Sequence, residues 1–92
     1  MKRGEHMNIE VKKPTQEEII KMQTLPIWEC DISEFDWYYD HEEICLLIDG
    51  EVTVTHAGGN VSFSAGDYVI FPQGLSCVWK VTKPVKKHYI FK

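Results

Sequence analysis

The side chains of this 92-residue chain that could do chemistry gather around one stretch, residues 37–50. Glu43 lies seven residues before Gly50 and supplies a carboxylate, which can accept a proton, hold an amine, amide or hydroxyl, or bind a metal ion. Trp37 and Tyr39 precede it at alternate positions. An indole N–H is only a donor, and a phenol with an ordinary pKa of about 10 is a poor metal ligand. Glu43 is therefore the residue on which a site here would depend.

Composition narrows the classes of function. A chain of this length allows one domain, and a net charge of −4 argues against a nucleic-acid or anionic-membrane surface. The cysteines are Cys30, Cys45 and Cys77; they are odd in number and form no CxxC motif, so we expect neither a disulfide framework nor structural zinc. Without an apolar leader or a run long enough to span a bilayer, we expect a cytoplasmic protein.

The first elements of the chain are predicted from local patterns. Residues 8–13 alternate polar and apolar side chains and predict a short strand. Thr15 and Glu18 have the spacing of a capping box, so we expect one helix of about two turns directly after Thr15. That helix would place Ile19 and Met22 on one face.

Short β-prone runs separated by Gly and Pro turns follow the helix. We expect strands over residues 27–32, 34–39, 42–48, 51–56, 61–64, 68–71, 75–81 and 85–91. Asp49-Gly50 predicts a type I′ hairpin turn, residues 57–60 a loop, and Pro84 a break between the last two strands. Such a series favours a sandwich or barrel. The lysines near both ends are interpreted as solvated edge-strand residues: Lys12, Lys13, Lys80, Lys83, Lys86 and Lys87.

Two spaced motifs resemble those of the cupin family. The second half of the family's first motif, G-x5-H-x-H-x3-E-x6-G, is matched by Glu43 and Gly50. The family's second motif, G-x5-P-x-G-x2-H-x3-N, is matched at its backbone-setting positions by Gly66, Pro72 and Gly74. The resemblance implies an all-β fold, a single-domain cupin (jelly-roll β-barrel) with one short N-terminal helix. We assign the domain to residues 8–92 and interpret residues 1–7 as a disordered extension.

A closer resemblance is to the small cupins grouped with (S)-ureidoglycine aminohydrolase and the ethanolamine-utilisation cupin domains. The strings PIWECDISEFDWYYDHEE and FPQGLSCVWKV carry it. The free-standing members of that subgroup are mostly of unassigned activity. The resemblance therefore implies a fold and a pocket, and it brings no reaction with it.

In the cupin family three imidazoles and one carboxylate hold a divalent transition metal. Those positions carry Trp37, Tyr39, Glu43 and Cys77 here, so only the carboxylate keeps its residue type. Two ligands, Glu43 and Cys77, fall short of the three that a catalytic zinc site takes from protein. We therefore expect no tightly bound metal and no cofactor. His41 could substitute as a ligand, but we favour a partly exposed histidine at the entry of the strand.

Strand alternation predicts the lining of a cavity. If Glu43 points inward, so do Cys45 and Leu47, while Ile44, Leu46 and Ile48 pack outward against another layer. The predicted cavity is aromatic with one carboxylate and is lined by Trp37, Tyr39, Glu43, Cys45, Cys77 and Trp79. A buried Glu43 needs a partner, for which we expect the Tyr39 hydroxyl or the N–H of Trp37 or Trp79.

Three functions remain open from the sequence. The first is a metal-free cupin that binds a small organic molecule beside Glu43. The second is an enzyme of nitrogen or carbonyl metabolism, ureidoglycine aminohydrolase-like, with Glu43 as general base and a weakly held metal. The third is a structural, dimerising domain whose aromatic side chains fill the core. We expect a homodimer, and we interpret Cys77 as a buried, inert thiol.

Overall fold

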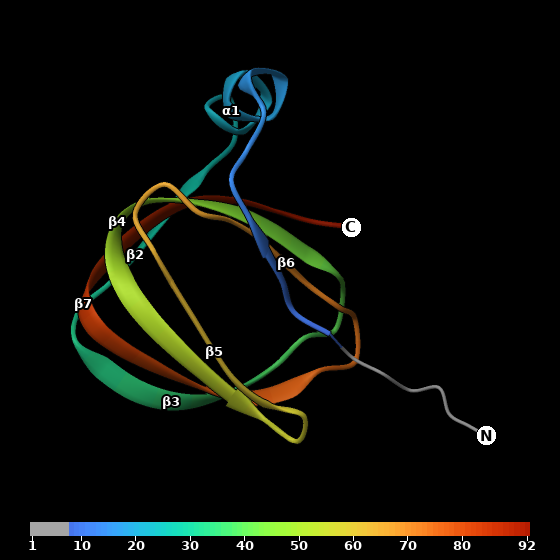
Figure 1. Cartoon of the computed structure of the whole chain (residues 1–92), viewed down its shortest axis with the longest axis vertical. Coiled ribbons are helices and arrows are strands. Elements are labelled where there is room, and N and C mark those ends of the chain that lie inside the picture. The colour runs from blue at the N-terminus through green and yellow to red at the C-terminus, as the bar shows by residue number, and fades with distance from the viewer. Residues whose placement is uncertain (1–7) are drawn as a thin grey trace.

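One curled sheet forms most of the molecule. The computed structural model describes residues 8–92, and the predicted extension at residues 1–7 lies outside the described residues. Among the described residues, the strands follow the order β1-β6-β4-β7-β2, with β3 paired to β7 and β5 to β4. The elements are β1 (Glu10–Lys12), α1 (Gln16–Met22), β2 (Ile27–Cys30), β3 (Ser33–Tyr38), β4 (Glu43–His56), β5 (Gly59–Ser64), β6 (Tyr68–Phe71) and β7 (Ser76–Phe91). The strands curve around a common interior and α1 lies at one end (Figure 1). The predicted all-β fold with one short N-terminal helix is confirmed.

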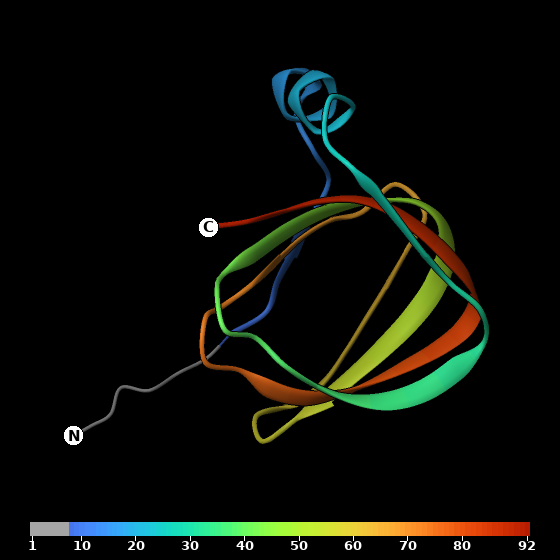
Figure 2. The same cartoon turned by 180° about the vertical axis from the view of Figure 1, so that it is seen from behind.

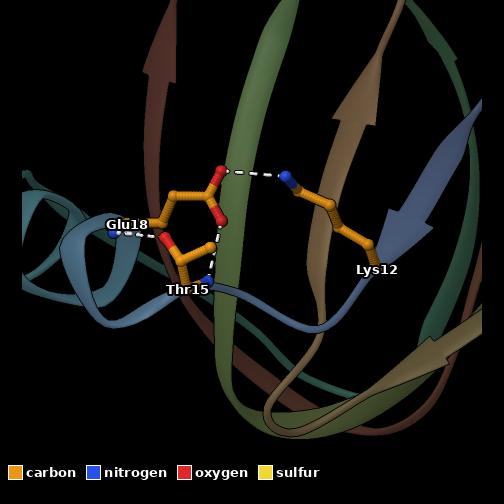
Figure 3. Close-up of polar contacts among 3 residues, drawn as sticks. All are labelled: Lys12, Thr15 and Glu18. Carbon is orange, nitrogen blue, oxygen red and sulfur yellow. Dashed lines mark hydrogen bonds and ion pairs between the residues drawn. The ribbon is translucent and has the colours of Figure 1, made fainter.

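Helix α1 begins with the predicted capping box. The backbone N–H of Glu18 donates to Thr15 Oγ1 at 3.1 Å, and the backbone N–H of Thr15 donates to Glu18 Oε1 at 2.8 Å. The second carboxylate oxygen of Glu18 accepts from Lys12 Nζ at 2.9 Å, which ties the helix to the end of β1 (Figure 3). Met22 is buried and Ile19 packs beside it, as the sequence predicts.

The predicted hairpin at Asp49-Gly50 is wrong. Strand β4 continues through both residues, and the turn comes later, at residues 57–58, where the sequence predicted a loop; His56 pairs with Gly59 across it. Gly50 has φ +107, and a Cβ built on it would lie 2.5 Å from the carbonyl oxygen of Pro84. The glycine therefore allows close approach of two strands in place of a chain reversal.

The predicted break at Pro84 is also wrong, because β7 runs unbroken from Ser76 to Phe91. Its pairing with β4 shifts register between Leu47 and Val52, opposite the segment that contains Pro84. A proline is tolerated in a strand at such an irregularity because it has no N–H to donate. Strand β7 pairs with β3 along its first part and β2 along its second, with β4 on its other edge (Figure 2).

The two faces of β4 serve two clusters. Cys45 and Leu47 point into the interior with the large rings, as predicted from Glu43. Ile44 and Leu46 pack on the opposite face with Met22 of α1, so the helix is the predicted outer layer. Ile48 does not join them and is 38% exposed, which corrects its predicted packing. Cys77 and Trp79 lie in the interior cluster, as predicted, together with Leu75 and Val81.

Candidate functional site

A cavity of about 160 Å³ opens at one end of the interior. Its rim includes Trp37 and Phe91, each 45% exposed, whereas Tyr39, Trp79, Glu43 and Lys87 lie buried at its inner end. The walls are aromatic and the deep polar groups are few. The lining residues are Trp28, Phe35, Trp37, Tyr39, Glu43, Trp79, Lys87, Tyr89 and Phe91.

Glu43 is held by an ion pair at the inner end of the cavity. Its Oε2 atom accepts from Lys87 Nζ at 2.8 Å, and the two residues are 3% and 5% exposed. Glu43 is the first residue of β4, and Lys87 lies on β7 across from Leu47, on the same inward-facing row. Two opposite charges taken out of water together in this way satisfy each other and leave no net charge.

This ion pair corrects two expectations. The sequence predicted that Glu43 would bond to Tyr39, Trp37 or Trp79, whereas its partner is Lys87. Lys87 was also expected to be solvated. Because β7 is continuous, its inward row runs through positions 85, 87 and 89, and this row carries Lys87 inside. The sequence does carry a signal for this inward position, because Val85 and Tyr89 flank Lys87 at a spacing of two.

Two indole rings face the ammonium group. Lys87 Nζ lies 4.8 Å from the ring centroid of Trp28 and 4.6 Å from that of Trp79. A cation over an indole face is attracted by the ring's quadrupole, and more so where water is excluded. The ammonium is therefore fixed by one carboxylate and two rings.

Tyr39 presents a protonated phenol to the same region. Trp79 Nε1–H donates to its hydroxyl oxygen at 3.0 Å. Burial, followed by the nearby negative charge of Glu43, raises the pKa of Tyr39 far above the ordinary value of a phenol. Among residues 8–92, no acceptor takes the hydroxyl proton of Tyr39. The phenol is therefore available as a hydrogen-bond donor.

Four of the six residues predicted to line the cavity do so: Trp37, Tyr39, Glu43 and Trp79. Cys45 and Cys77 do not, because their short side chains are packed within the interior cluster. Burial raises the pKa of Cys45 to about 12 and that of Cys77 to about 11, so both are poor nucleophiles. The sequence missed Trp28, Phe35, Lys87, Tyr89 and Phe91, whose inward facing depends on strand pairings that it did not reveal.

The residues at the family's ligand positions do not fit a transition metal. In the described part of the chain, no three His, Cys, Asp or Glu side chains come together as a ligand set. His41 is exposed, as expected, and Cys77 lies outside the cavity lining. Glu43, which alone of the four keeps the residue type of the family's ligand set, already has the Lys87 ammonium group beside its carboxylate. No helix within residues 8–92 has the length and apolarity that a membrane crossing requires.

Comparisons with known proteins agree with the predicted fold. A crystal structure of a DUF861 family protein from Thermotoga maritima superposes with a TM-score of 0.88 at 44% identity, covering 92% of this chain and 100% of that one. The EutQ protein of Clostridium difficile gives a TM-score of 0.63 at 28% identity, over 68% of this chain and 50% of that one.

Sequence comparison reaches the same group. Acetate kinase EutQ of Escherichia coli (strain K12) is 34% identical over 56 residues, which are 61% of this chain and 24% of that protein. The chain thus matches about a quarter of that relative's length. The family described as the EutQ-like cupin domain matches residues 18–89. The jelly-roll cupin fold and the subgroup resemblance are both confirmed, and the chain belongs to the EutQ-like cupin domain family.

Proposed function

We propose that this domain binds a small, uncharged organic molecule in its aromatic cavity. One observation carries the proposal: the buried Glu43–Lys87 ion pair lies at the inner end of a cavity that holds about 160 Å³. Buried ionic groups cost free energy unless they are satisfied, and an apolar pair of similar shape would fill the same space more cheaply. Polar groups converging in an apolar pocket are typical of a ligand site.

The size of the cavity limits the ligand. An apolar cavity of about 150 Å³ is enough to hold one benzene ring. The cavity here is similar in volume and lined mainly by rings. We therefore expect a ligand of about the size of one six-membered ring with a small substituent. Planar or apolar parts of such a molecule would contact Trp37 and Phe35 at the walls.

The charges of the cavity favour a neutral ligand. Glu43 and Lys87 compensate each other, so a charged ligand would add an unpaired charge in an apolar setting. The polar atoms left for a ligand are complementary: the Tyr39 hydroxyl donates, Lys87 has further N–H groups, and Glu43 Oε1 accepts. A neutral molecule with a carbonyl oxygen and a neighbouring hydroxyl or N–H matches this arrangement.

Three other functions receive less support. A metal-dependent hydrolase with Glu43 as base would need ligands that the described residues do not bring together. The kinase named for the Escherichia coli relative would need room for a nucleotide, which is several times larger than one ring. A filled, purely structural core is disfavoured by the open volume beside Glu43.

A fragment screen with a matched pair of variants tests the proposal. Small neutral carbonyl, amide and hydroxy compounds would be screened by thermal shift and by NMR shifts of the tryptophan indole protons. Trp37→Ala should weaken any hit, because Trp37 lines the cavity, whereas Tyr38→Ala should not, because Tyr38 is exposed and absent from the lining. If no fragment binds, or if both variants weaken binding equally, the proposal fails.

A further inference from the structure

We infer that Lys87 forms an imine with the carbonyl carbon of a small aldehyde or ketone held in the cavity, with Glu43 carrying the proton. This inference rests on the proposed binding function and names the chemical class of its ligand. Among the described residues that line the cavity, Lys87 is the only amine. Its Nζ atom lies 2.8 Å from a carboxylate oxygen, within reach for direct proton transfer.

The step balances in atoms, protons and charge. In the resting site the pair is an ammonium and a carboxylate. Glu43 Oε2 takes a proton from Lys87 Nζ, and the neutral amine adds to the carbonyl carbon to give a carbinolamine. The proton held by Glu43 then passes to the carbinolamine hydroxyl, which leaves as water while the C=N bond forms. The products are a protonated imine at Lys87, a carboxylate at Glu43 and one water molecule.

The surroundings of Lys87 stabilise the product as well as the resting state. The carboxylate and the two indole faces hold a positive charge at Nζ, and the protonated imine carries its charge at the same atom. Those interactions are therefore made both by the resting ammonium and by the protonated imine.

The cavity also orients the carbonyl group. The Tyr39 hydroxyl is buried and keeps its proton, so it can donate to the oxygen of a carbonyl placed beside Lys87. That donation polarises the C=O bond toward attack by the amine.

Reductive trapping tests the inference. The full chain would be incubated with cyclohexanone or benzaldehyde, reduced with sodium borohydride and mapped by peptide mass spectrometry. Lys80 and Lys83, both exposed on the same strand, serve as references within the same molecule. We expect Lys87 to be labelled about tenfold or more above them, since the cavity holds the carbonyl next to the amine. Labelling of Lys87 at or below the level of Lys80 would overturn the inference.

Two variants separate the possible causes of the result. Lys87→Arg keeps the positive charge but cannot form the imine, so label at this position should disappear. Glu43→Gln removes the proton acceptor and should slow labelling of Lys87 without changing that of Lys80. If either variant fails to fold, the comparison of lysines within the native chain still decides. Binding of cyclohexanone seen by NMR without any trapped product would refute the imine alone, whereas neither binding nor product would refute the binding function too.

Discussion

Lys87 Nζ lies 2.8 Å from Glu43 Oε2, and both side chains are more than nine-tenths buried. The pair joins the start of β4 to the second half of β7, the two longest strands of the sheet. It is the point at which the fold and the candidate site depend on the same residues. The stability of the domain and the polarity of its cavity are therefore linked.

Removing one member of the pair should cost more than removing both. Lys87→Met leaves a buried carboxylate without a partner, which we expect to lower the free energy of unfolding by about 3–5 kcal/mol. The double variant Glu43→Gln with Lys87→Met should recover part of that loss. The coupling is measured by urea unfolding of the native chain, Lys87→Met, Glu43→Gln and the double variant. Lys80→Met serves as an exposed control. If the losses in the free energy of unfolding of the two single variants add up to the loss of the double variant, the two charges do not interact in solution.

Gly50→Ala should be more destabilising than Gly66→Ala. Both glycines have a positive φ, +107 and +94, so both substitutions carry the strain of a left-handed residue, about 1–2 kcal/mol. At Gly50 the added Cβ would also lie 2.5 Å from a backbone oxygen of Pro84, whereas at Gly66 nothing lies within 4 Å. We expect a further cost of about 1–3 kcal/mol at Gly50. Equal midpoints in urea for the two variants would contradict the close approach of β4 and β7.

The capping carboxylate should make stability depend on pH in a defined direction. The hydrogen bond from the Thr15 backbone, and then the one from Lys12, lower the pKa of Glu18 below its ordinary value of 4.5. A lowered pKa in the folded state contributes stability above pH 4.5, and this contribution is lost as the pH falls through the folded value. Glu18→Gln should therefore destabilise the domain at pH 7 and make little difference near pH 2. Glu17→Gln, one position earlier and exposed, should show no such change across thermal scans.

Local signals in the sequence were sufficient where one residue pattern determines one structure. The capping box at Thr15 and Glu18 is formed as predicted. Alternation from Glu43 also placed Cys45 and Ile44 on their correct faces. These features depend on neighbours within a few positions, so the sequence alone carries them.

The errors arise where distant strands decide the outcome. Asp49-Gly50 has the residues of a tight turn, but pairing of β4 with β7 keeps the chain extended, and the glycine serves the close contact with Pro84. Lysine is typical of solvent-facing strand positions, but the same pairing turns Lys87 inward to Glu43. In both cases tertiary contacts override the local preference of the residue type. The lining residues that were not predicted lie on β2, β3 and β7, where pairing between distant strands decides which side chains face the cavity.

The three cysteines should differ sharply in reactivity. Burial raises the pKa of Cys45 to about 12 and of Cys77 to about 11, so at pH 8 the thiolate of Cys77 is about one part in a thousand and that of Cys45 is rarer still. Cys30 is only partly buried, with its Sγ 3.4 Å from Ser33 Oγ. Iodoacetamide labelling followed by mass spectrometry should modify Cys30 first, and Cys45 and Cys77 only after unfolding in urea. Rapid labelling of Cys77 in the native chain would show an accessible thiol next to Glu43 and would reopen nucleophilic catalysis by that residue.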